Sequence, residues 1–147
     1  MPFFLLPKSE TAYLLENNTV RQGLEKMQHY GYTAVPVLDE DGRYVGSITV
    51  ADFLWYIKDI HDMSLASAGK MPLKDVPRRH DNQSVAIDAK ITDMFHAAME
   101  QNFIPVVDDF GVFIGIVRRR AILEYYMEKF LAANGEAPEE KIYQKSF

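Results

Sequence analysis

The chain has 147 residues, is 48% hydrophobic and 25% charged, and carries a net charge of −5. This length and composition predict one globular domain, or two very small ones that share a core. The acidic balance argues against a general nucleic-acid surface, and the absence of cysteine excludes disulfides, thiolate catalysis and cysteine-based zinc sites. The apolar start lacks the features of a signal peptide, and nothing reaches the length of a membrane span. We therefore expect a cytoplasmic protein that contacts no membrane.

The first half of the chain predicts the order strand, helix, strand, strand, helix. A near-continuous apolar run and the acidic turn Glu40–Arg43 indicate a covered strand followed by a hairpin. Gly31 is expected to end the first helix. The expected elements are a strand at Thr11–Leu14, a helix at Thr19–Tyr30, strands at Ala34–Leu38 and Tyr44–Ile48, and a helix from Thr49 through Ile57.

The second half repeats this order. Its expected elements are a strand at Val85–Ile87, a helix at Ile91–Gln101, strands at Ile104–Val107 and Val112–Val117, and a helix at Arg119–Phe130. The domain organisation that we expect is a first repeat at residues 7–61, a linker at 62–83, a second repeat at 84–130 and a flexible C-terminal tail at 131–147.

The two halves also share a motif at a constant spacing. A Pro-containing apolar strand, an acidic Gly turn and a later Gly recur 69 residues apart, in the pairs Pro36 and Pro105, Asp39 and Asp108, Gly42 and Gly111, and Gly46 and Gly115. Internal repetition of this kind predicts two copies of one unit packed together. Shared clefts are then expected between the copies.

The segment Gly46–Asp52 lies where a strand is expected to end and a helix to begin. The N-terminus of a helix offers unpaired N–H groups and a partial positive charge, which suit a phosphate. The hydroxyl of Thr49 could bind that phosphate, and the carboxylate of Asp52 could accept hydrogen bonds from a ribose. The same Thr-x-x-Asp spacing is also close to that of a capping box, in which both side chains only satisfy the helix backbone. The sequence leaves both interpretations open.

The doubled strand–helix–strand–strand–helix pattern, with its Gly-x-apolar-Thr-x-x-Asp motif, resembles a pair of CBS domains, an arrangement called a Bateman module. The resemblance covers about residues 7–130. It implies an α/β fold of two CBS repeats with internal pseudo-twofold symmetry, and an adenine nucleotide bound in a cleft between them. It also implies a homodimer formed through the helices of both repeats.

The resemblance assigns residues to two clefts by their position. In one cleft, Thr49 would contact phosphate and Asp52 would hold the ribose, with Thr33, Ser47 and Ala86 beside them. The residues expected at the other cleft are Glu10, Ala12, Asn102, Ile104, Ile116 and Arg118.

The second repeat departs from the pattern. Arg118 stands at the position of Thr49, and Ala121 stands at that of Asp52, so the ribose carboxylate is missing. This departure puts ordinary mononucleotide binding at the second cleft in doubt.

Three consecutive arginines, Arg118, Arg119 and Arg120, begin the last helix. Arginine forms bidentate, charge-assisted hydrogen bonds with phosphate, so the three could act as a phosphate clamp. Alternatively, they pair with a neighbouring subunit or with acidic side chains of this chain, namely Asp108, Asp109 and Glu124.

The stretches Thr11–Tyr13 and Gly31–Ala34, together with the arginines, also resemble stand-alone bacterial CBS-pair proteins that bind cyclic di-AMP. A ligand with two phosphates and two adenines would tolerate the loss of the ribose carboxylate.

These features favour a non-catalytic, regulatory module. We expect it to bind an adenine nucleotide (AMP, ADP, ATP or cyclic di-AMP) and to signal to a separate, unidentified partner protein. No positioned base or nucleophile supports an enzymatic role, and we expect no metal and no cofactor besides the nucleotide as a regulatory ligand. The alternative is a structural dimerisation or adaptor module whose clefts are empty.

Overall fold

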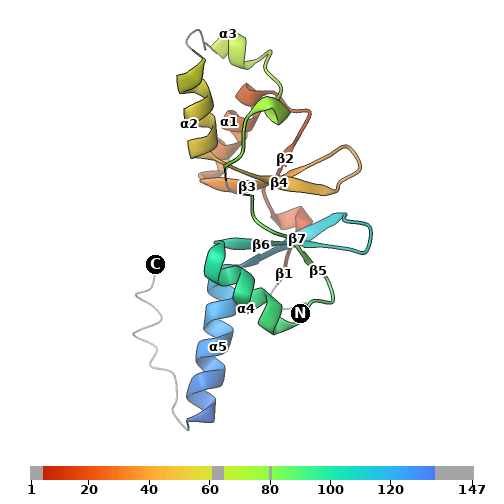
Figure 1. Cartoon of the computed structure of the whole chain (residues 1–147), viewed down its shortest axis with the longest axis vertical. Coiled ribbons are helices and arrows are strands. Elements are labelled where there is room, and N and C mark those ends of the chain that lie inside the picture. Colours follow the sequence, from red (N-terminus) through yellow and green to blue (C-terminus); the bar gives the residue numbers. More distant parts are fainter. Residues whose placement is uncertain (1–4, 61–64, 80, 135–147) are drawn as a thin grey trace.

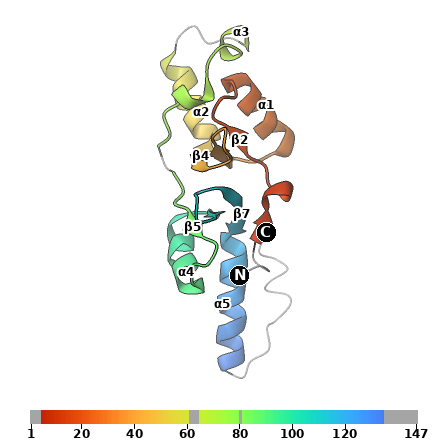
Figure 2. The same ribbon diagram turned by 90° about the vertical axis from the view of Figure 1, so that its right-hand side faces the viewer.

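The structure, a computed structural model, describes residues 5–60, 65–79 and 81–134. The two halves of the chain lie one above the other, each with its helices on the outer side and its sheet toward the middle (Figure 1). The view turned by 90° shows the same stacking, with the segment between α3 (Leu65–Ala68) and β5 (Val85–Ala86) running along one side (Figure 2). This confirms the predicted α/β architecture of two repeats, each with its own small sheet.

The first repeat follows the predicted order closely. Its main elements are β2 (Leu14–Leu15), α1 (Val20–Tyr30), β3 (Ala34–Leu38), β4 (Tyr44–Thr49) and α2 (Val50–Asp59). The helix α1 begins at a capping box formed by Thr19 and Gln22, and it ends at Gly31, whose φ of 73° is left-handed. Local capping chemistry therefore sets both ends of this helix.

The second repeat contains the equivalent elements. Besides β5, they are α4 (Ile91–Glu100), β6 (Phe103–Val107), β7 (Phe113–Arg118) and α5 (Arg119–Ala133). The helix α5 runs three residues beyond the predicted end at Phe130, because Leu131, Ala132 and Ala133 are favourable helix residues. Most of the predicted C-terminal tail, residues 135–147, lies outside the described part of the chain.

The N-terminal segment forms a strand that the sequence analysis did not predict. This strand, β1 (Leu5–Pro7), pairs antiparallel with β7 at the edge of the second sheet, whose order is β1-β7-β6-β5. The first sheet has the order β2-β3-β4. The start of the chain thus completes the sheet of the second repeat before the chain enters the first.

The predicted strand at Thr11–Leu14 is wrong except for its last residue. A 3-10 turn at Lys8–Glu10 precedes it, and the hydroxyl of Thr11 donates a hydrogen bond of 2.7 Å to the carbonyl of Pro7. In this part of the chain, strand pairing begins only at Leu14, where β2 pairs in parallel with β3. Local hydrogen bonding by a threonine side chain competes with strand pairing here.

Three clusters of buried side chains hold the molecule together. One lies in each repeat, and the segment 65–76 contributes Ala68, Leu73 and Val76 to the first of them. The third joins the two repeats, with Leu38 from β3 packed among Phe103, Phe113 and Ile116.

The two hairpins meet near the pseudo-twofold axis and bond to each other through their backbones. The N–H of Tyr44 donates to the carbonyl of Gly111 at 3.1 Å, and the N–H of Phe113 donates to that of Gly42 at 2.9 Å. These pairs are related by the spacing of 69 residues, so both copies contribute identically to the junction.

No helix among residues 5–60, 65–79 and 81–134 is both long enough and apolar enough to cross a membrane.

The close approach of β1 to β7 generates a first prediction. A Cβ atom at position 115 would lie 2.3 Å from the carbonyl oxygen of Leu6, so only glycine leaves room for β1. We expect Gly115→Ala to lower the free energy of unfolding by roughly 2–3 kcal/mol and to expose the backbone amides of β1 to hydrogen exchange.

The control is Gly31→Ala, which has a left-handed φ but no atom within 4 Å of the added carbon. It should cost about 1 kcal/mol in conformational strain and leave β1 protected. Equal exchange of the β1 amides in both variants would contradict the steric argument.

Candidate functional site

Two cavities lie at the junction of the repeats, and they are related by the repeat spacing. The first, here the Arg118 cavity, has a volume of about 180 Å³; it is lined by Leu6, Thr11, Ala12, Tyr32, Thr33, Ala34, Val35, Pro36, Asn102, Phe103, Ile116 and Arg118. The second, here the Thr49 cavity, is a wider hollow of about 620 Å³ lined by Thr33, Ala34, Ser47, Thr49, Val50, Ala51, Asn82, Glu100, Gln101, Asn102 and Arg119. Both cavities contain Thr33 and Asn102, which are equivalent positions of the two repeats.

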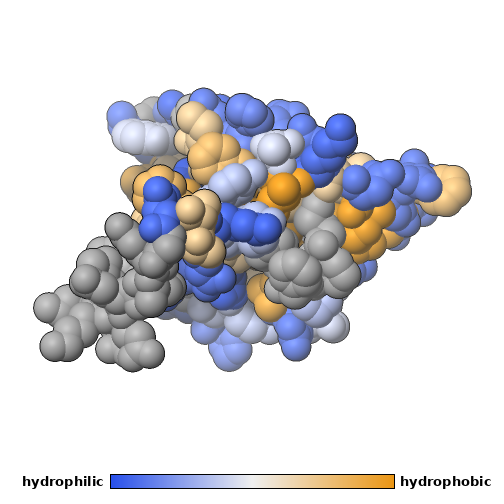
Figure 3. Space-filling view, turned by 90° about the horizontal axis from the view of Figure 1, so that it is seen from below, coloured by the Kyte–Doolittle hydropathy of each residue, from blue (hydrophilic) through white to orange (hydrophobic). Residues whose placement is uncertain are grey.

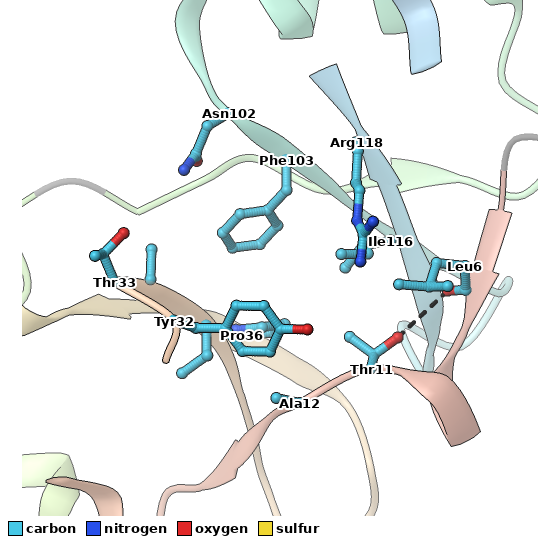
Figure 4. A pocket seen from close by; sticks show the side chains of 12 residues that line it. Leu6, Thr11, Ala12, Tyr32, Thr33, Pro36, Asn102, Phe103, Ile116 and Arg118 are labelled. Atoms are coloured by element: carbon cyan, nitrogen blue, oxygen red, sulfur yellow. Dashed lines mark hydrogen bonds between the residues drawn. The ribbon is translucent and has the colours of Figure 1, made fainter. Parts of the chain in front are cut away.

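The Arg118 cavity combines apolar walls with a few polar groups (Figure 4). Apolar surface comes from Ala12, Pro36, Phe103 and Ile116. Such a mixture is typical of small-molecule sites, where apolar walls take up a flat ring and sparse polar groups orient it.

Arg118 has the longest polar side chain of the residues that line this cavity. It ends β7 and stands at the N-cap of α5 without making a side-chain capping bond. Its guanidinium extends into the cavity beside Ile116 (Figure 4), and among the described residues it makes no ion pair or side-chain hydrogen bond. An exposed, uncompensated guanidinium at a concave surface is suited to an anionic ligand.

The Thr49 cavity has a different character, because its predicted anchor groups are bonded to each other. The N–H of Asp52 donates to the hydroxyl of Thr49 at 3.1 Å, and the N–H of Thr49 donates to the carboxylate of Asp52 at 2.9 Å. Asp52 is only 3% exposed and also accepts a hydrogen bond of 3.2 Å from the N–H of Arg79. The capping-box interpretation therefore describes the contacts that the structure shows for this pair.

Ser47 is also engaged by the segment that connects the repeats. Its N–H donates to Asp81, and its hydroxyl accepts from the N–H of Asn82, both at 2.9 Å. The hydroxyl of Tyr44 donates to the carbonyl of Asn82, and burial raises the pKa of Tyr44 to about 12. Arg78 completes the set with an ion pair to Asp81 at 2.9 Å.

The three arginines at the start of α5 have three different environments. Arg118 lines the first cavity, whereas Arg119 lines the second and donates from Nε to the carbonyls of Ala98 and Gln101. Arg120 pairs with Glu124 at 2.8 Å on the exposed face of the helix and lines neither cavity. Successive residues of a helix point in different directions, so the three arginines do not converge on one ligand.

The structure brings together most of the predicted residues but places some of them elsewhere. Ile104 is fully buried in the core of the second repeat. Four predicted residues besides Ile104 line neither cavity, namely Glu10, Asp52, Ala86 and Arg120. Strand alternation explains Ile104, whose side chain points to the core while the neighbouring Phe103 faces the junction.

Sequence reasoning missed several cavity residues, among them Leu6, Pro36 and Phe103, whereas Tyr32 lies in the stretch Gly31–Ala34 that it singled out. The signal for Pro36 was present, because it belongs to the repeated motif itself. Leu6 gave no comparable signal, since its position depends on the pairing of β1 with β7.

A family model described as CBS domain matches residues 6–59 and 73–128, one match to each repeat. The chain belongs to the CBS-domain family. One relative, cyclic di-AMP receptor B of Bacillus subtilis (strain 168), is 27% identical over an alignment of 126 residues that covers 82% of each protein.

Solved structures share the fold of this CBS pair. A CBS-domain protein from Streptococcus pneumoniae TIGR4 has a TM-score of 0.77 at 28% identity, over 88% of this chain and 87% of that one. CbpB of Listeria monocytogenes in complex with cyclic di-AMP has a TM-score of 0.75 at 22% identity, over 88% and 96%. CBSX2 in complex with AMP has a TM-score of 0.66 at 20% identity, over 86% and 94%. Two of these three structures thus hold an adenine nucleotide, cyclic di-AMP in CbpB and AMP in CBSX2.

The buried position of Asp52 generates a second prediction. Replacing it by alanine leaves the N–H groups of Thr49 and Arg79 without their acceptor. We expect Asp52→Ala to lower the free energy of unfolding by about 1–3 kcal/mol, and Asp52→Asn, which keeps one acceptor oxygen, to cost less. Denaturant unfolding measures both.

Asp93→Ala is the matched control, because Asp93 lies in the first turn of α4 and that helix has no side-chain cap. It should cost only a few tenths of a kcal/mol through the helix dipole. Equal losses at positions 52 and 93 would contradict a structural role for Asp52.

Proposed function

We propose that this CBS pair is a non-catalytic regulatory sensor that binds an adenine nucleotide in the Arg118 cavity and signals to a separate partner protein in the cytoplasm. The observation that carries the proposal is the apolar cavity between the repeats, with a guanidinium at its wall that has no ion pair or side-chain hydrogen bond to any residue of 5–60, 65–79 and 81–134. An adenine ring fits the apolar surface, and a phosphate fits Arg118.

Cyclic di-AMP is the ligand that this cavity favours over a mononucleotide. Ala121 stands where a ribose carboxylate is expected, so the second repeat offers cationic and apolar contacts without an acceptor for a diol. A cyclic dinucleotide has no free ribose diol but carries two phosphates and two adenines. The relative from Bacillus subtilis that is named a cyclic di-AMP receptor supports the same ligand class.

The position of the cavity supports a signalling role. Its walls come from both repeats, so a ligand that binds there contacts the two halves at once. A ligand shifts a conformational equilibrium only by its different affinity for the two states. The partner protein would then recognise a surface whose shape depends on the relative position of the two repeats.

The proposal is tested by calorimetric titration with cyclic di-AMP, AMP, ADP and ATP. We expect cyclic di-AMP to bind most tightly, and Arg118→Gln to weaken its binding roughly tenfold to 100-fold, because a charge-assisted contact is lost. Saturating ligand should also raise the melting temperature, since ~100 times the dissociation constant adds ~2.7 kcal/mol.

The matched control is Arg120→Gln, which removes the same charge two residues away but lines neither cavity. Its affinity should stay within about twofold of the unmodified chain, because it loses only a surface ion pair with Glu124. Binding of none of the four nucleotides, or equal losses in the two variants, would contradict the proposal.

A second candidate function is a structural dimerisation module with empty clefts. Its support is the exposed apolar side chains on two equivalent helices, Leu54 and Trp55 on α2 and Leu123, Met127 and Phe130 on α5. Figure 3 shows hydrophobic residues in several separate groups between hydrophilic ones at the end of the molecule seen from below. Exposed apolar helix faces are suited to a homodimer interface.

We expect the chain to sediment as a homodimer, and the double change Leu54→Glu and Leu123→Glu to shift it to a monomer with unchanged helix content. Met99→Glu is the control, because Met99 is 66% exposed but lies on α4. Monomeric behaviour of the unmodified chain would rule out this second candidate. A dimer that binds no nucleotide would favour it over the sensor.

A further inference from the structure

The two cavities occupy equivalent places in the repeats but have diverged in chemistry. Position 47 in the first repeat is the polar Ser47, whereas its equivalent is the apolar Ile116. The strand pairings Leu14–Val37 and Val85–Val106 make Gln83 the equivalent of Ala12; Ala12 lines the Arg118 cavity, whereas the polar Gln83 lines neither cavity. The pseudo-symmetry of the backbone therefore does not extend to the ligands that the two sites can accept.

Four residues of the connecting segment, here the Asp81 network (Arg78, Arg79, Asp81 and Asn82), bond to the first repeat. Arg78, Asp81 and Asn82 bond to β4, and Arg79 bonds to Asp52 in the first turn of α2. The carboxylate of Asp81 accepts from the N–H of Ser47 and from Nε of Arg78, each at 2.9 Å. A Cβ atom at Gly46 would lie 2.7 Å from both partners of that ion pair. The network thus lies directly on the backbone of β4.

Asn82 extends the network across to the second repeat. Its side-chain amide donates to the carbonyl of Phe103 at 3.1 Å, while its backbone N–H donates to Ser47. The residues equivalent to Val35 and Pro36, which line the Arg118 cavity, are Ile104 and Pro105, and they do not line the Thr49 cavity. Asn82 itself lines the Thr49 cavity, so the connecting segment forms part of that cavity's wall.

The same network uses the carboxylate that a ribose would need. One oxygen of Asp52 accepts from Thr49 and the other from Arg79, and the guanidinium of Arg79 lies 5.4 Å from the ring centre of Trp55. Because Asp52 is only 3% exposed and lines neither cavity, a diol could reach its carboxylate only by displacing these contacts. A buried N–H without an acceptor costs about 1–3 kcal/mol. Arg118 has no such internal competitor among the described residues.

We infer that the two clefts are unequal: the chain binds one nucleotide, in the Arg118 cavity, while Asp52 serves as the anchor of the connecting segment at the other cleft. The inference rests on the proposed function, which it deepens by fixing the number of ligands per chain and the role of Asp52. It assigns the Thr-x-x-Asp motif of this chain to holding the Asp81 network on β4.

The first experiment measures stoichiometry by calorimetric titration with cyclic di-AMP and, separately, with AMP. We expect one ligand per chain, a dissociation constant at least about tenfold higher in Arg118→Gln, and a change within about twofold in Asp52→Asn. Two ligands per chain, or a loss of binding in Asp52→Asn comparable to that in Arg118→Gln, would overturn the inference.

A second experiment does not depend on any ligand. Amide hydrogen exchange should be slow at Ser47 and Arg79 in the unmodified chain, because the N–H of the buried Ser47 donates to Asp81 and that of Arg79 donates to the buried carboxylate of Asp52. Asp52→Ala should speed exchange at Arg79 at least about tenfold, and Asp81→Ala should do so at Ser47, while the amide of Val37 in the core strand stays protected.

The two experiments separate the inference from the function on which it rests. If neither nucleotide binds, the sensor proposal is wrong, and the exchange data still decide the role of Asp52. If Arg79 and Ser47 exchange freely in the unmodified chain, or are unaffected by the alanine variants, the anchoring role is wrong even where a nucleotide binds.

Discussion

The hydrogen bonds between the two hairpins are the constraint on which the rest of the molecule depends. Tyr44 and Phe113 each donate from the backbone to a glycine carbonyl of the opposite hairpin. Because these bonds are related by the repeat spacing, they fix a pseudo-twofold axis, and the third core, around Leu38 and Phe103, forms across it. The cavities lie beside this axis, so both repeats must be in place before either site exists.

Each repeat is also completed by chain that precedes or follows it. The strand β1 covers β7, and the segment before β5 covers β4, but the two edges are covered by different means. A backbone ladder leaves side chains available for other contacts. The Asp81 network instead covers the edge of β4 with side chains, and its hydrogen bonds occupy the carboxylates of Asp81 and Asp52. This difference explains why two cavities built by one motif differ in chemistry.

The positions of the three arginines show that a run of charges in the sequence does not determine what each side chain contacts. Three adjacent guanidiniums are distributed to a cavity wall, to the carbonyls at the end of α4 and to a surface ion pair. Within the described part of the chain, Arg118 is the one of the three that makes no ion pair or side-chain hydrogen bond, since it lies at the end of a strand whose face is turned to the junction. What each of the three arginines can bind therefore depends on the direction of its side chain.

The sequence by itself determined the repeat, the order of most strands and helices, the hairpins and the end of the first helix at Gly31, but it left two interpretations of Thr49 and Asp52 open. These features depend on periodicity and on contacts between residues a few positions apart, which the chain encodes locally. Only the tertiary structure decided that Leu5–Pro7 joins the far sheet, that Arg79 engages Asp52, and that a cavity opens beside Arg118. Each of these depends on partners distant along the chain, whose approach is set by the packing of the two repeats.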